Sequence, residues 1–216
     1  TASANIATSS ILKVKETKTS VEINNIEVPY DTNYNRKLTI KGNVSVIGKI
    51  YNVPGLIVQT ISEMVHDIVS YPSSVSLEIS PLTITIKPKI ITSKIKLEWM
   101  INFEADHNTV FIIYRKIGSN SPIKIGYNNT IADNRWNGVV TVPYDNNQSS
   151  TLQSVYLNWI DEPNTLEEVT YYIYFQNSTT GTRIFYLNRT YGGSSDIGEN
   201  YNERSVSSKL AMEVLK

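Results

Sequence analysis

The chain has 216 residues, 40% of them hydrophobic and 19% charged, which is typical of a folded globular protein and too apolar for an intrinsically disordered one. Its 20 basic and 20 acidic residues cancel, which argues against nonspecific binding to nucleic acid or to an anionic membrane. The absence of cysteine excludes disulfides, thiol catalysis and cysteine-ligated metals.

Residue choice favours β-structure. The chain has 27 isoleucines and 14 tyrosines but only 6 alanines. Alanine is the best helix former, whereas isoleucine and tyrosine suit a pleated sheet. No run approaches the roughly 18 apolar residues of a membrane span, and the polar first ten residues lack the basic and apolar parts of a signal peptide. We therefore expect an all-β protein without a membrane span.

The first two segments in chain order precede the main domain. Residues 1–37 are polar, with scattered Lys and Glu, and predict an extended N-terminal arm rather than a core element. From residue 38 the sequence LTIKGNVSVIGKI alternates apolar positions around a Gly42-Asn43 turn signal. Residues 38–52 are therefore predicted to form a short β collar, and residues 53–216 the main domain.

Residues 54–69 leave two structures open. Ile57, Ile61, Met64, Val65 and Ile68 fall at helical spacing, whereas the Ile, Val and Thr content of the same stretch favours a strand. One short helix is therefore a candidate here, beside a strand.

After residue 80 the apolar residues alternate with a period of two, which predicts half-buried strands. In KIKLEWMINFE the residues expected to face inward are Ile95, Leu97, Trp99, Ile101 and Phe103. Further runs are separated by turn signals: LTITIK, VFIIYRK, VVTV, LQSVYLNWI, VTYYIYFQ, RIFYL and SVSSKLAMEV. About eight strands at this spacing predict a β-sandwich, closed as a single jelly roll.

The run VTYYIYF places large residues on both faces of one strand. Tyr171, Tyr172, Tyr174 and Phe175 stand almost side by side after a Pro-Asn turn signal. One face of this strand is expected to be buried in the core. For the other face, an interface with a neighbouring subunit and an ordinary solvent-exposed surface both stay open.

The sequence contains no recognised catalytic motif, and we expect no enzymatic activity and no catalytic residues. His66 and His107 lie far apart, neither has a second histidine at metal-ligand spacing, and nothing marks a nucleophile or an oxyanion hole. We expect no cofactor-binding residue, no metal site and no cofactor.

Three groups of charged residues were weighed as sites. The first is Asp161 and Glu162, with Glu167 and Glu168 nearby; neighbouring acids on an extended chain point to opposite faces, so DEPN is interpreted as a turn rather than a glycosidase pair. The second group consists of acids in Asn-rich loops, which are candidates for binding calcium although their spacing matches no known site: Asp133, Asp145 and Asp196. The third group consists of arginines near the C-terminal end, which we expect to form ion pairs: Arg183, Arg189 and Arg204.

Several blocks resemble, in order, a jelly-roll module at the C-terminal ends of phage tail-fibre and other virion proteins. The blocks are VPGLIVQTISEMVHDI, SPLTITIKPKIITSKIKLEWMINFE, NWIDEPNTLEEVTYYIYFQN, IFYLNRTYGG and RSVSSKLAMEV, and they cover residues 53–216. The chain departs from the module's usual Asp-Ser-Pro turn, which is Asp161-Glu162-Pro163 here, and its first block is longer and more helix-like. The resemblance implies an assembly scaffold without catalytic residues.

The length and the Ile, Asn, Lys and Tyr bias also resemble the minor virion, or penton, proteins of Sputnik-type virophages. This resemblance implies a capsid protein of the virion that forms homopentamers at icosahedral vertices beside a major capsid protein. The arm at residues 1–37 would then contact neighbouring subunits or face the interior. No nucleic-acid partner is expected.

The alternative is the trimeric receptor-binding head of a viral fibre. The same module would then bind a host receptor through loops such as residues 128–137 or 191–201. A fibre head normally follows a long repetitive shaft, whereas only about 50 residues precede the module in this sequence. This difference favours the capsid interpretation.

Overall fold

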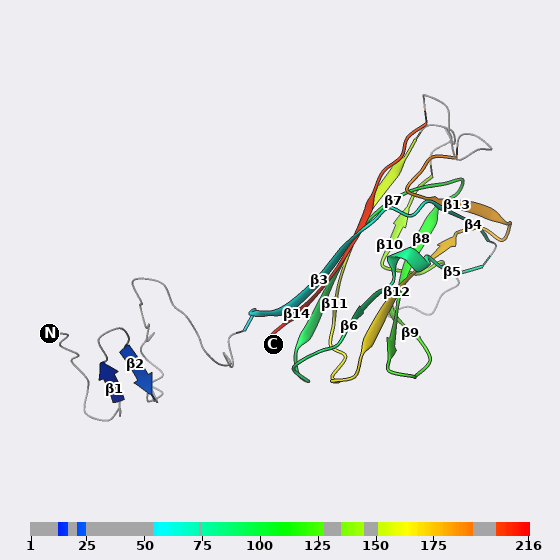
Figure 1. Cartoon of the computed structure of the whole chain (residues 1–216). Helices are drawn as coiled ribbons and strands as arrows, with labels where there is room; N and C mark the ends of the chain where they lie inside the picture. Colours follow the sequence, from blue (N-terminus) through cyan, green and yellow to red (C-terminus); the bar gives the residue numbers. More distant parts are fainter. Residues whose placement is uncertain are drawn as a thin grey trace, which may run out of the picture. The chain divides into compact units, whose positions relative to one another are not determined.

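The computed structural model describes residues 13–16, 21–24, 54–73, 75–127, 135–144, 151–191 and 202–216. The chain divides into two compact units, Thr1–Lys49 and Ile50–Lys216. In the first unit, β1 (Lys13–Glu16) and β2 (Val21–Asn24) pair antiparallel, where the sequence predicted only an extended arm (Figure 1). The collar predicted at residues 38–52 lies outside the described residues, and the boundaries at 37 and 52 stay predictions.

The second unit consists of two antiparallel sheets (Figure 1). The first, here called the β7 sheet, contains β3 (Ile57–Val65), β4 (Val69–Ser73), β7 (Lys94–Ala105), β11 (Gln153–Asp161), β13 (Arg183–Leu187) and β14 (Ser207–Val214). The second, the β8 sheet, contains β5 (Leu77–Glu78), β6 (Ile84–Ile86), β8 (Thr109–Ile117), β9 (Ile123–Gly126), β10 (Val140–Val142) and β12 (Val169–Asn177). A short 3-10 helix, η1 (Ser80–Leu82), lies between β5 and β6.

The strand order is that of a jelly roll. Strands β14 and β13 both pair with β7 and so share one position in the sheet; β3 pairs with β14 and β4 pairs with β13, so β3 and β4 share the next position. The β7 sheet therefore has the order β3/β4, β14/β13, β7, β11. By the same reasoning the β8 sheet has the order β5/β6, β12, β8, β9/β10. With positions numbered along the chain, the two sheets are 1-8-3-6 and 2-7-4-5, the double Greek key of a jelly roll. The predicted all-β jelly-roll sandwich is confirmed.

The helix that the sequence left open at residues 54–69 is not formed. Gly55, with φ of 81°, turns the chain so that its N–H donates to Leu215 O at 3.0 Å, and β3 then pairs with β14 from Ile57 to Val65. Among the residues at helical spacing, only Val65 is buried. The spacing misled because this stretch is an edge strand, in which backbone pairing and β-branched side chains decide the conformation.

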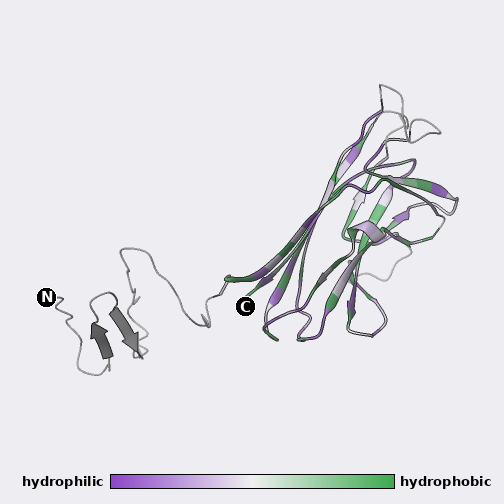
Figure 2. Cartoon of the chain, in the orientation of Figure 1, coloured by the Kyte–Doolittle hydropathy of each residue, from purple (hydrophilic) through white to green (hydrophobic). Residues whose placement is uncertain are grey.

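The core lies between the inner faces of the two sheets. The five residues of β7 predicted to face inward are all fully buried, and Trp99 donates its indole N–H to Leu82 O at 2.9 Å. All four phenylalanines of the chain meet in one cluster, in which the ring centroids of Phe175 and Phe185 are 4.5 Å apart and those of Phe103 and Phe111 5.1 Å. Apolar residues therefore recur along the strands of both sheets (Figure 2).

A buried polar network joins the strands of the β7 sheet where β3 gives way to β4. Asn188, in the left-handed region with φ of 58°, donates its side-chain amide to Val65 O at 2.8 Å and Asp67 O at 2.9 Å. Its Oδ1 accepts from the Ser207 hydroxyl at 2.6 Å, and that hydroxyl accepts from Asn102 N–H at 2.9 Å. Asn188 thereby replaces the backbone pairing that is lost at residues 66–68.

Gly118 lies in the turn between β8 and β9 with φ of 52°. An added Cβ would lie 2.2 Å from a carboxylate oxygen of Glu167, a flexible side chain that is able to move. We expect Gly118→Ala to lower the free energy of unfolding by about 1 kcal/mol through the left-handed backbone alone. Urea unfolding measures this. The control is Gly181→Ala, where the added Cβ meets nothing within 4 Å, and an equal loss in both variants would contradict the argument.

Candidate interaction surface

Strand β14 presents its charged residues to the core side and its apolar residues to the outside. Ser207, Lys209, Ala211 and Glu213 alternate as buried positions, whereas the intervening Ser208, Leu210, Met212 and Val214 are only half-buried. An antiparallel sheet with one solvated face normally shows the opposite arrangement. Lys209 and Glu213 both find hydrogen-bond partners on the buried side, which explains this arrangement.

Lys209 anchors η1 from within the sandwich. Its ammonium donates to the carbonyls of Pro81 and Thr83, each at 2.9 Å, and lies 3.0 Å from the Glu63 carboxylate on β3. The two carbonyls belong to the turn around η1, where they accept hydrogen bonds from the buried Lys209 ammonium.

Glu213 is fully buried and holds the loop before β7. Its carboxylate accepts the backbone N–H groups of Lys89 at 2.9 Å and Ile90 at 2.8 Å, and the Ser93 hydroxyl at 2.8 Å. Gln59 on β3 donates to the same carboxylate at 2.7 Å. A carboxylate with this many donors is a well-satisfied structural acceptor.

The outside of the β7 sheet therefore carries apolar residues among its polar and charged ones. All three methionines of the chain lie on it, one each on β3, β7 and β14. The most exposed members are Met64 at 55%, Met100 at 41%, Tyr156 at 57% and Ile160 at 57%. We call this surface the outer face; its apolar residues are Met64, Met100, Tyr156, Ile160, Leu210, Met212 and Val214.

The charges of the outer face are paired within the chain. Lys96 Nζ lies 2.6 Å from a Glu98 carboxylate oxygen, and hydrogen bonding to Lys96 lowers the pKa of Glu98. Glu162 binds both Lys216 and Lys94, and these hydrogen bonds, chiefly the one from Lys216, lower its pKa. An open hollow in the middle of the face is lined by Ser62, Glu63, Met64, Glu98, Met100, Tyr156, Ser208, Lys209 and Leu210. The outer face is therefore suited to contact with another protein surface of low net charge.

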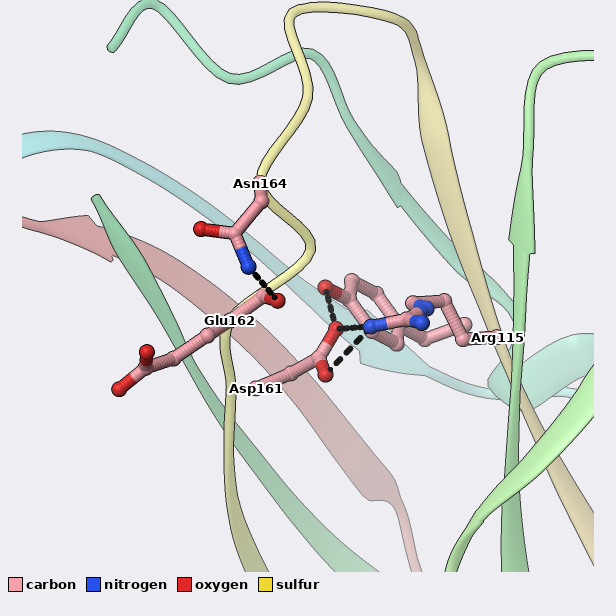
Figure 3. Close-up of polar contacts among 5 residues, drawn as sticks. Arg115, Asp161, Glu162 and Asn164 are labelled. Atoms are coloured by element: carbon pink, nitrogen blue, oxygen red, sulfur yellow. Dashed lines mark hydrogen bonds and ion pairs between the residues drawn. The ribbon is translucent and has the colours of Figure 1, made fainter. Parts of the chain in front are cut away.

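Asp161, weighed from the sequence as a catalytic carboxylate, ties the two sheets together. At the end of β11 it receives Arg115 Nη1 at 2.8 and 3.0 Å and the Tyr171 hydroxyl at 2.8 Å (Figure 3). Arg115 and Tyr171 are cross-strand partners on β8 and β12 of the other sheet. Burial, followed by the charge of Asp161, raises the pKa of Tyr171 well above its usual value, so the phenol stays a donor.

Glu162 points away from Asp161 (Figure 3). Its backbone carbonyl accepts the Asn164 side-chain amide at 2.9 Å, and Asn164 has φ of 51°, so the chain leaves β11 at this segment and enters the loop before β12. The two acids do not converge, as the alternation along an extended chain predicted. Glu167 and Glu168 are exposed beyond the turn.

The aromatic strand β12 is buried on one face, as predicted. Tyr171 and Phe175 are fully buried, whereas Tyr172 and Tyr174 are half-buried on the other side. The ring centroids of Tyr174 and Tyr114 on β8 are 4.4 Å apart. An interface on this second face stays a prediction.

Of the remaining sequence candidates that the structure describes, only Arg189 and Arg204 are brought together, through their backbones. His66 is exposed, and His107 stacks on Tyr144 with ring centroids 5.4 Å apart. Arg183 forms an ion pair with Asp106 at 3.7 Å, whereas Arg189 lies over the Tyr186 ring and pairs through its backbone with Arg204. The calcium candidates Asp133, Asp145 and Asp196 lie outside the described residues.

Within the part of the chain that the structure describes, no three His, Asp or Glu residues cluster in a way that would hold a metal ion. In the same part, no helix has the length and apolar character to cross a membrane.

Neither a protein-family model nor a curated protein sequence matches the chain. Among solved structures, it is similar to a chain of the infectious bursal disease virus Gx strain, with 8% identity, a TM-score of 0.34 and coverage of 95% of this chain and 47% of that one. A chain of the VP2 subviral particle of the same virus gives 10% identity, a TM-score of 0.32 and coverage of 80% and 46%. The chain thus spans about half the length of these proteins. Because these TM-scores are low, the architecture is assigned from the strand order and not from this structural similarity.

Proposed function

We propose that the chain is a non-enzymatic structural protein of a virus particle that assembles with copies of itself. The observation that carries this proposal is the outer face of the β7 sheet, where β14 directs Leu210, Met212 and Val214 outward while Lys209 and Glu213 are satisfied inside. Exposed apolar residues that gather on one face of a sheet mark a surface for contact with another protein. The jelly-roll order and the resemblance of residues 53–216 to virion modules support the virion as its location.

The finer proposal is a homopentamer at the icosahedral vertices of a capsid, next to a major capsid protein. Single jelly rolls are a recurrent building unit of viral capsids. Because the charges of the outer face are paired within the chain, a neighbouring protein subunit suits this face better than a nucleic acid.

A fibre head is the second candidate, because exposed aromatic residues also lie in the loops considered as receptor-binding sites. Trp136 is 43% exposed and Tyr191 is 49% exposed, and each borders or belongs to a loop weighed as a receptor-binding site. In this alternative the chain would form trimers.

Native mass spectrometry of the purified chain, full length and without residues 1–37, tests the proposal. We expect pentamers, and their loss on trimming would assign the arm a part in assembly. Stable trimers would replace the vertex assignment with the fibre head, and a monomer at every concentration would contradict self-assembly.

Tyr156→Glu is expected to weaken this association. Tyr156 is 57% exposed on β11, so an acid is tolerated in the monomer, whereas burying the carboxylate under a neighbour would cost about 2 kcal/mol or more, roughly a 30-fold rise in the dissociation constant. Dilution followed by native mass spectrometry measures the change. The control is Ile123→Glu, 51% exposed on β9 of the other sheet. Equal dissociation of both variants would contradict a specific role of the outer face.

A further inference from the structure

We propose that copies of the chain join head to tail, with the β11 edge of one subunit adding to the β3 edge of the next. This inference rests on the proposed self-assembly and adds to it a contact at the two edges of the β7 sheet, beside the outer face. Strands β3 and β11 occupy the two ends of the β7 sheet, so one such contact can repeat from copy to copy, and it forms a ring when its rotation divides a full turn.

Both edges are long and offer free backbone. Each strand has nine residues, and within the described residues β11 pairs only with β7 and β3 only with β14. The β11 ladder runs from Gln153 to Asp161 without a bulge, and that of β3 is regular from Gln59 to Val65. An open strand edge of this length is a template for another strand.

Neither edge carries the features that normally prevent pairing between molecules. The sequences IVQTISEMV and QSVYLNWID contain no proline, lysine or arginine. Each has one acid, but Glu63 is held by Lys209 at 3.0 Å and Asp161 by Arg115 at 2.8 Å. Natural edge strands are usually protected by charges, prolines or bulges. Strand β3 has one register shift, at Val58 near its start, and the rest of both edges is unprotected, which indicates that both are covered in the assembled protein.

The directions of the strands fit this contact. Each of β3, β14, β7 and β11 is antiparallel to the next, so the two edge strands of one sheet run in opposite directions. A rotation that brings β11 of one copy beside β3 of the next therefore pairs them antiparallel. Pairing of β11 with β11 across a two-fold axis would satisfy one edge and leave β3 open, which is why we infer the head-to-tail contact.

The side chains beside the two edges match as well. Ser62, Leu210, Glu98 and Asn158 form one row across the outer face, since Leu210 pairs with Ser62 and Glu98 pairs with both Leu210 and Asn158. Extending this row across the contact sets Asn158 opposite Ser62 of the next copy. In this register the exposed Tyr156 lies opposite the exposed Met64, which removes apolar surface from water, and Ile160 lies opposite Thr60.

Single cysteines test the contact directly, because the chain has none of its own. We would prepare Asn158→Cys, Ser62→Cys, the double variant, and Asn158→Cys combined with Thr141→Cys, which is exposed on β10 of the other sheet. The oligomer of each is treated with a short bismaleimide, whose span covers facing and diagonal cross-strand positions roughly 5 to 8 Å apart. Denaturing gels then count the linked chains.

We expect the Asn158/Ser62 pair to form a ladder that ends at the oligomer seen by native mass spectrometry, and the singles and the Thr141 pair to give monomers. Dimers from Asn158→Cys alone would overturn the inference in favour of two-fold pairing. An intact oligomer without links in the double variant would overturn it too, while leaving the proposed self-assembly in place. A monomeric wild-type chain would overturn both.

Discussion

Replacing Arg115 by methionine is expected to lower the free energy of unfolding by about 3 to 5 kcal/mol, because Asp161 would stay buried without its cation. The Arg115 and Asp161 side chains are only 17% and 9% exposed, and both carboxylate oxygens receive the guanidinium. Methionine retains the apolar stem, so the change isolates the charge. Urea unfolding followed by tryptophan fluorescence measures the loss, since Trp99 is fully buried.

Lys116→Met is the matched control, because it removes a cation from the neighbouring position of the same strand. We expect this variant to change stability by less than about 0.5 kcal/mol. The double variant Arg115→Met with Asp161→Leu should lose less than Arg115→Met alone, because no buried charge remains. A loss below about 1 kcal/mol in Arg115→Met would show that water replaces the guanidinium at Asp161.

Glu213→Gln is expected to cost about 3 kcal/mol or more, although the two side chains have nearly the same shape. The carboxylate accepts from Lys89 N–H, Ile90 N–H, the Ser93 hydroxyl and the Gln59 amide. A glutamine amide places its NH₂ group against some of these donors, and each buried donor left unpaired costs about 1 to 3 kcal/mol. Urea unfolding gives the total loss of stability.

Hydrogen exchange locates the effect of Glu213→Gln. The backbone amides of Lys89 and Ile90 should exchange faster in the variant, because they lose their acceptor. Glu168→Gln, at an exposed position before β12, is the control and should leave both stability and exchange unchanged. Unchanged protection of Lys89 and Ile90 in Glu213→Gln would contradict the assigned role of the carboxylate.

Strands whose two faces differ in polarity were predictable from the sequence. In β7 the alternation from Ile95 to Phe103 correctly predicted five inward residues, because a period of two in a half-buried strand reflects which side meets the core. The opposite directions of Asp161 and Glu162 follow from the same alternation. Turn chemistry likewise predicted the loop at Asn164, which adopts φ of 51°.

The outer face was not predicted. The sequence SSKLAMEV shows Lys209 and Glu213 alternating with Leu210, Met212 and Val214, a signal that two large polar residues share one face. Such a pattern is usually interpreted as a strand whose charged side chains face water and whose apolar side chains face the core. The structure does the reverse because the partners that satisfy them, such as Pro81 O for Lys209 and Lys89 N–H for Glu213, are more than 120 residues away in the chain.

The amino-acid order by itself determined the all-β class, the run of alternating strands and the burial of the aromatic strand, because alternation, β-branched residues and turn signals act between near neighbours. Tertiary structure decided that residues 57–65 form an edge strand, that Asp161 joins two sheets through Arg115 and Tyr171, and that β14 turns its apolar residues to the outer face. These features depend on which distant groups satisfy a buried charge or leave a backbone edge open. Only the folded chain brings those groups together.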